Sequence, residues 1–179
     1  MPSISAPERS SRSVAQPAAA CTCGRLRRAT RALTQLYDDA MAPVGLRITQ
    51  FSLLRTLARE GPLHISDLAA RQLLDRTALS RNLDPLVEQR YVAIVRGRDA
   101  RTKEVAITRE GASALRAAEP CWGRAQREVA ARLGAQRLDA LIDTLGALES
   151  LHPGMTPSPL APLASPRRGE RTQKTSRRK

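Results

Sequence analysis

Residues 75–111 read DRTALSRNLDPLVEQRYVAIVRGRDARTKEVAITREG, and this stretch decides the fold. It opens on Asp75, a residue type that caps helix N-termini, and leucines then recur at helical spacing. The chemistry changes to β-branched residues over 91–96 and to alternating polarity over 103–107, with a turn-like segment between them. The stretch therefore predicts a helix followed by a two-stranded hairpin.

The first turns of this helix carry residue types that contact DNA. Arginine bonds guanine and asparagine bonds adenine through paired hydrogen bonds, while serine and threonine suit phosphates or bases. Arginines on a hairpin tip fit a minor groove or the flanking phosphates. Because Pro85 removes one helical hydrogen bond, we expect a kink or an irregular last turn there. The candidate DNA-binding residues are Arg76, Thr77, Ser80, Arg81 and Asn82 on the helix and Arg96, Arg98 and Arg101 on the hairpin.

The segments before this stretch are also helical. Apolar residues recur at helical spacing over 24–41, and Thr49 and Ser66 are placed to cap two further helices. Between these two helices, residues 63–65 are long enough only for a small strand or an extended link. Short helices followed by a basic hairpin are typical of a winged helix-turn-helix. The predicted fold is therefore mainly α with a small β wing.

The helices after the hairpin leave more apolar surface than a small domain can bury. Thr108 is placed to cap a long helix striped over 112–133, and a last helix follows over 137–150. Together with the stripe on 24–41, these faces predict a dimer joined through its N- and C-terminal helices; the alternative is a monomeric core. A twofold dimer would set two recognition helices roughly 10 bp apart, which implies a palindromic operator.

Charge and composition divide the chain into three parts. The net charge is +13, and residues 152–179 carry seven Lys or Arg and one Glu. Residues 1–20 are rich in Ser, Ala and Pro, and residues 152–179 are basic and rich in Pro, so we expect a disordered arm and a disordered tail. The folded domain is expected over 21–151, with its DNA-binding lobe at about 48–110. The positive charge favours a polyanionic partner.

The sequence shows no pattern of an enzyme. It contains no nucleophile–base set, no phosphate-binding glycine motif and no metal-ligand spacing, so we expect no catalytic residues, metal or cofactor. Three cysteines are too few for a disulfide scaffold, and no apolar run is long enough to span a membrane, which indicates the cytoplasm. Cys121 lies in an apolar stripe and is a predicted core residue.

Between about residues 21 and 151 the sequence resembles the MarR family of bacterial regulators. Residues 97–101 and 105–111 match the family's wing signature, an Asp followed two residues later by an Arg and then by an LT-x-x-G exit, although Ile107 replaces the leucine. The segments that carry the resemblance are ITQF at 48–51, ISDLA at 65–69, DRTALSRNL at 75–83, GRDAR at 97–101 and VAITREG at 105–111.

The resemblance implies a dimeric, sequence-specific regulator of transcription. By resemblance, Arg101 would enter the minor groove, Asp99 would hold it in position, and Thr108 would cap the next helix. The first helix and the last two helices would form the dimer interface. The predicted function is that of a repressor of transcription. The alternative is a non-specific nucleic-acid-binding or nucleoid protein driven by charge.

Members of this family usually release DNA when a small aromatic ligand binds or when a cysteine oxidises. For a ligand pocket between the dimer helices and the DNA-binding lobe, the candidates are Arg31, Tyr37 and His64. For oxidation, Cys21 and Cys23 lie beside several arginines near an expected helix N-terminus, which favours the reactive thiolate. They would lie about 200° apart on a helix, so a disulfide between subunits forms more easily than one between the two. Alternatively, both are unreactive residues at a frayed end.

Overall fold

The computed structural model describes residues 21–97 and 103–152, which form six α-helices and a small sheet. The predicted fold, mainly α with a small β wing, is confirmed. The elements in chain order are α1 (Thr22–Met41), the 3-10 turn η1 (Ala42–Val44), α2 (Ile48–Glu60), β1 (Leu63–His64), α3 (Ile65–Arg71), α4 (Arg76–Glu88), β2 (Val92–Arg96), β3 (Lys103–Ile107), α5 (Arg109–Leu133) and α6 (Ala135–Glu149).

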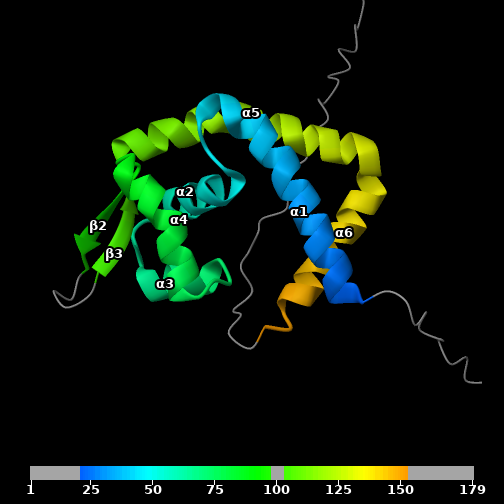
Figure 1. Ribbon diagram of the computed structural model, residues 1–179, viewed down its shortest axis with the longest axis horizontal. Helices are drawn as coiled ribbons and strands as arrows, with labels where there is room; N and C mark the ends of the chain where they lie inside the picture. The colour runs from blue at the N-terminus through cyan, green and yellow to red at the C-terminus, as the bar shows by residue number, and fades with distance from the viewer. Residues whose placement is uncertain (1–20, 98–102, 153–179) are drawn as a thin grey trace, which may run out of the picture.

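The long helix α5 connects two halves of the molecule (Figure 1). At one end of α5 lie the sheet and helices α2, α3 and α4, and at the other end lie α1 and α6. The three strands pair antiparallel in the order β1-β3-β2, so the predicted hairpin and the short strand before α3 are confirmed. None of the described helices combines the length and the apolar composition needed to cross a membrane.

The core lies beneath the hairpin and is built mainly of leucine. Aromatic side chains contribute one stacked pair, Phe51 and Trp122, whose ring centroids are 5.9 Å apart. Cys121 is buried, as predicted. Since α2 supplies much of this core, it holds α3 and α4 against the sheet. The largest fully buried side chains are Phe51, Met41, Leu53, Leu54, Leu57, Leu68, Leu79, Leu86 and Val105.

Two of the four predicted helix caps are confirmed. The Asp75 carboxylate accepts the Ala78 amide at 2.7 Å and begins α4, and the Thr108 hydroxyl accepts the Gly111 amide at 3.0 Å and begins α5. Of the two alternatives predicted at Pro85, a kink or an irregular last turn, the irregular turn is wrong, because the helix continues through Pro85 and closes with the Gln89 amide on the Pro85 carbonyl at 3.0 Å. The kink stays a prediction.

The predicted caps at Thr49 and Ser66 are wrong, because both helices begin two residues earlier than these caps imply. Helix α2 starts at Ile48, and its first amide is satisfied from a distant part of the chain, by the Asp38 carboxylate at 2.7 Å. Helix α3 starts at Ile65, directly after β1, and has no side-chain cap. Tertiary partners and the short strand therefore set these starts in place of the local hydroxyls.

Helix α5 starts where three elements meet. The Thr108 amide donates to the Tyr91 carbonyl at 3.0 Å, and its hydroxyl donates to the Arg90 carbonyl at 2.7 Å, so β3 and α5 are fixed to the link between α4 and β2. At Gly111 a Cβ atom would lie 2.0 Å from the Tyr91 carbonyl oxygen. The glycine is therefore required by the close approach of the two backbones.

We expect Gly111→Ala to lower the free energy of unfolding by about 3 kcal/mol, because the backbone oxygen of Tyr91 must move to admit the methyl group. Urea unfolding at a fixed protein concentration measures this change. The control is Gly123→Ala in the same helix, where the new Cβ meets only the end of the Arg127 side chain at 3.4 Å. It should leave stability unchanged or raise it by up to about 1 kcal/mol. Equal stability of the two variants would contradict the close contact at Gly111.

Candidate nucleic-acid interface

Helix α4 presents a polar face away from the core. Leu79, Leu83 and Leu86 are buried and fix the orientation of the helix. Arg81 lies roughly 165° around the helix from the centre of that buried face, and it is exposed. The Asp75 cap fixes the first turn, so the exposed groups on this turn are held in a defined position. The exposed candidates on this face are Arg76, Thr77, Ser80 and Arg81.

Asn82 differs from the other helix candidates. It is half-buried, and its side-chain amide donates to the Ala78 carbonyl of its own helix at 2.9 Å. It also lines a small hollow of about 240 Å³ together with Thr49 of α2 and Leu74 before α4. The structure therefore places Asn82 toward α2, beside the exposed face and not on it.

The hairpin carries a second basic group. Arg96 and Lys103 are directly opposite each other at the described end of the β2–β3 ladder, and both are exposed. Lys103 is two residues from Val105 on β3, so both lie on the same face of the sheet, and Arg96 opposite Lys103 lies on that face too. Val105 is fully buried, so this is the face that packs on the helices. The candidates Arg98, Asp99 and Arg101 lie outside the described residues.

Lys103 was not among the candidates from sequence reasoning. Its signal was available, because strand pairing outward from the turn places it opposite Arg96. Like charges directly opposite on two strands destabilise a sheet, so the pair lowers the stability of the isolated hairpin. A phosphate between the two cations would remove that repulsion. The arrangement is suited to bind a polyanion.

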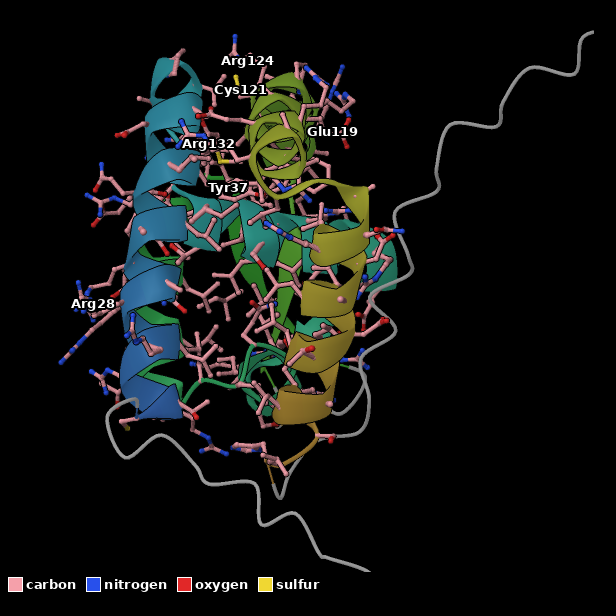
Figure 2. All side chains as sticks on the ribbon, turned by 90° about the vertical axis from the view of Figure 1, so that its right-hand side faces the viewer. Arg28, Tyr37, Glu119, Cys121, Arg124 and Arg132 are labelled. Atoms are coloured by element: carbon pink, nitrogen blue, oxygen red, sulfur yellow. The ribbon has the colours of Figure 1, made fainter. Side chains whose placement is uncertain are left out.

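The three candidates for a ligand pocket lie on two elements, α1 and β1. Arg31 is exposed on α1; Tyr37, also on α1, donates its hydroxyl hydrogen to the Gln126 side chain of α5, and burial raises the pKa of Tyr37. His64 in β1 lies 3.7 Å from the Glu104 carboxylate of β3. Figure 2 shows Tyr37 in the space between α1 and α5, whereas Arg28 of α1 points outward. Tyr37 therefore joins two helices.

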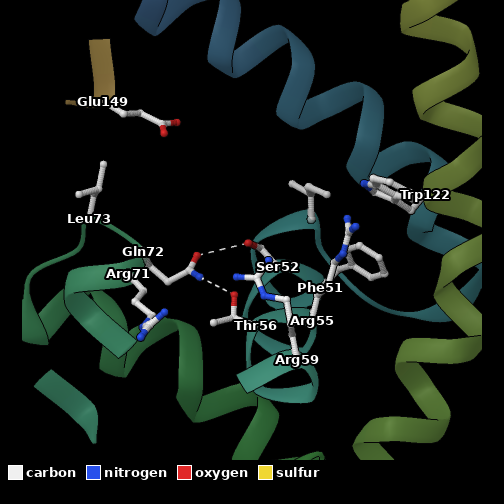
Figure 3. A pocket seen from close by; sticks show the side chains of 11 residues that line it. Phe51, Ser52, Arg55, Thr56, Arg59, Arg71, Gln72, Leu73, Trp122 and Glu149 are labelled. Atoms are coloured by element: carbon white, nitrogen blue, oxygen red, sulfur yellow. Dashed lines mark hydrogen bonds between the residues drawn. The ribbon is translucent and has the colours of Figure 1, made fainter. Parts of the chain in front are cut away.

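A larger hollow, of about 340 Å³, lies between α2, the end of α3, α5 and α6 (Figure 3). Its lining combines arginines with one aromatic wall: the Arg55 guanidinium lies 4.5 Å from the centre of the Trp122 ring. Arg59 and Arg71 also line it, and both pair with Glu60. Within residues 21–97 and 103–152 no carboxylate lies at ion-pair distance from Arg55. Glu149 of α6 also lines the hollow, which is therefore polar, with three arginines and one carboxylate in its lining.

The two cysteines proposed for redox sensing lie at the start of α1. Cys21 is the residue before the helix and Cys23 is in its first turn, and both thiols are free and exposed. The described residues contain no group of three or more His, Cys, Asp or Glu that could hold a metal ion.

A capped helix with an exposed polar face, followed by a basic hairpin, defines a winged-helix DNA-binding protein. A sequence profile of the MarR family matches residues 44–102. The transcriptional regulator MosR of M. tuberculosis, solved in complex with DNA, is 39% identical; the match covers 74% of this chain and 98% of MosR, with a TM-score of 0.65. The chain belongs to the MarR family of transcriptional regulators, which are not enzymes, as the sequence predicted.

Other relatives are more distant. MarR of E. coli in its apo form is 23% identical over 72% of this chain and 98% of its own, with a TM-score of 0.60, and it supports the fold. An uncharacterised HTH-type transcriptional regulator of Bacillus cereus is 32% identical over 96 residues. That match spans 54% of this chain and 64% of the relative.

We expect Lys103→Ala to weaken DNA binding similarly on all sequences and to reduce the slope of log K against log salt by about 1. At the same time the variant should unfold at a slightly higher urea concentration, because Arg96 loses a like-charged neighbour. Fluorescence titrations at several salt concentrations measure the slope. Arg116→Ala on the outer face of α5 removes the same charge and serves as the control. If the two variants bind DNA equally, Lys103 does not contact phosphate.

Proposed function

We propose that the chain is a homodimeric repressor that reads a palindromic operator. The observation that carries this proposal is the capped start of α4, whose exposed Arg76 and Arg81 lie beside a hairpin ending in Arg96 and Lys103. Arg98 and Arg101 would extend that hairpin into the minor groove, with Asp99 orienting Arg101. The folded unit of this regulator would be 21–151, with its DNA-binding lobe at about 48–110. It would act in the cytoplasm, on the chromosome.

Site selection from random DNA followed by footprinting on the selected duplex tests this function. Wild-type protein should protect two half-sites about 10 bp apart, with affinity orders of magnitude above that for random DNA. Arg81→Ala should cost about 1–3 kcal/mol and relax the preference at one position in each half-site, because a lost guanine contact affects only that base pair. Arg116→Ala is again the control. Equal affinity for all DNA would favour the alternative, a non-specific nucleoid protein.

The dimer is supported by helices that are incompletely covered in a single chain. Helix α6 has no buried residue, and Ile142 on its apolar stripe is 55% exposed. In α1 only Met41 is buried, and Leu33 is 37% exposed. Both helices flank α5 at the end of the molecule away from the hairpin (Figure 1). A second copy placed there would cover these leucine-rich faces and leave both α4 helices free for DNA.

Ile142→Glu should separate the dimer into folded monomers, because a carboxylate would replace an apolar side chain that a partner buries and that this chain leaves exposed. Analytical ultracentrifugation measures the mass. Ala147→Glu places the same charge on the opposite, exposed face of α6 and should keep the dimer. A wild-type mass equal to that of one chain would contradict the dimer.

For the releasing signal we propose a small planar aromatic anion bound in the hollow of Figure 3. Arg55 lies over the Trp122 ring and lacks a carboxylate partner among the described residues, and Ser52 and Thr56 add hydroxyl groups; the lining also includes one carboxylate, that of Glu149. Arginine pairs with carboxylates through two parallel hydrogen bonds, so Arg55 suits an aromatic acid. Arg31, Tyr37 and His64 do not line this hollow, so the proposed site takes Arg55 in their place.

The alternative signal is oxidation of Cys21 and Cys23. It is supported by their exposure at the start of α1, a helix proposed for the dimer interface. Oxidation there would act on the association of subunits and, through it, on the spacing of the two recognition helices. If the double variant Cys21→Ser, Cys23→Ser still releases DNA on addition of peroxide, this alternative is wrong.

A further inference from the structure

Gln72 joins the floor of the hollow to the start of the recognition helix. It follows the last residue of α3, and its side chain reaches across to α2 (Figure 3). The amide nitrogen donates to the Thr56 hydroxyl at 3.0 Å, and the amide oxygen accepts from the Ser52 hydroxyl at 3.3 Å. The nitrogen and the oxygen of the Gln72 amide are thus both held by hydroxyls of a single helix, α2.

The residue after Gln72 has an unfavourable backbone conformation. Leu73 has a φ of 51°, in the left-handed region that disfavours side chains with a Cβ, and it is 38% exposed. Two residues later, Asp75 caps α4. The short link between α3 and α4 therefore stores backbone strain, and the two bonds of Gln72 help to hold it.

The same polar atoms face the proposed effector. Ser52, Thr56, Gln72 and Leu73 all line the hollow next to Arg55. An anion drawn in by Arg55 would accept the hydrogen of the Ser52 hydroxyl, since anions are stronger acceptors than the Gln72 amide oxygen. The Thr56 hydroxyl accepts from the Gln72 amide nitrogen, so it can donate to the anion and keep that bond. Occupancy of the hollow and the tie between Gln72 and α2 would then compete for one donor, the Ser52 hydroxyl.

We propose that Gln72 is a positioning residue that couples the hollow to DNA binding. With the hollow empty, its two hydrogen bonds hold the strained link at Leu73, and α4 is in the orientation that fits the groove. When an aromatic anion takes the Ser52 hydroxyl hydrogen, one of the two bonds of Gln72 is lost, the link relaxes and the start of α4 shifts. This inference rests on the proposed function, both for DNA binding by α4 and for the effector in the hollow.

The first test removes the tie without touching the DNA-facing side chains. Gln72→Leu keeps the side-chain size and loses both hydrogen bonds; it should lower affinity for the selected duplex roughly tenfold with no effector present. Hydrogen exchange at amides 73–78 should become faster, while α2 and α5 stay protected. Gln89→Leu, at the other end of α4, is the matched control and should leave both measurements unchanged.

The second test relieves the backbone strain at Leu73, and its expected effect on DNA affinity is opposite to that of the first test. Asparagine tolerates the left-handed conformation, so Leu73→Asn should stabilise the tied link and keep or raise DNA affinity. With 4-hydroxybenzoate as the probe, we compare the dissociation constant for the selected duplex with and without probe. The ratio of the two constants should be smaller in both variants than in wild type, because the link is already free in Gln72→Leu and resists release in Leu73→Asn.

Opposite effects of the two variants on DNA affinity support the coupling. If both variants weaken binding alike, or if Gln72→Leu keeps wild-type affinity and exchange, the proposal is overturned, because Gln72 then only packs. Calorimetry measures whether the wild-type chain binds 4-hydroxybenzoate, and it separates a failure of the Gln72 proposal from a failure of the proposed function. A wild-type chain that does not bind the probe removes the aromatic anion from the proposed function, and the two probe-free measurements still decide the role of Gln72. Selection of no duplex by the wild-type chain removes the DNA-binding proposal itself.

Discussion

Hydrogen bonds at Thr108 hold α4, the hairpin and α5 in one frame. Through its amide and hydroxyl this residue fixes β3 and α5 to the carbonyls of Tyr91 and Arg90, which lie between α4 and β2. These three parts of the molecule thus share a single junction, and Gly111 allows the backbones to touch. A threonine followed three residues later by glycine is therefore a geometric requirement: the hydroxyl caps the helix, and the missing Cβ makes room for the carbonyl.

Local chemistry predicted the order of the elements because most of it depends on nearby residues. Helical spacing of leucines, the carboxylate at Asp75 and the hydroxyl at Thr108 act within one turn of chain, and all were confirmed. The starts of α2 and α3 were predicted two residues late, because the groups that settle them come from elsewhere. The Asp38 carboxylate of α1 satisfies the first amide of α2, and β1 runs directly into α3. No pattern within either helix contains that information.

The candidate interface was predictable to the level of the face, and less so for single side chains. Arg76 and Arg81 are exposed as a helical wheel requires, whereas Asn82, one step further around, bonds back to its own helix. Lys103 was missed because its importance comes from the register with Arg96, which only strand pairing reveals. The hollow at Arg55 could not be read from sequence, since its walls come from four elements distant along the chain.

Helix α6 has a consequence for how the amount of this regulator is controlled. A 15-residue helix with no buried residue has little stability of its own, since isolated helices of that length are marginal in water. In the dimer proposed above, pairing would protect this end, whereas dilute, separated chains would fray there and be open to proteolysis. Degradation would then remove the protein fastest when it is scarce, so its level in the cell would fall sharply below a threshold and would otherwise hold steady.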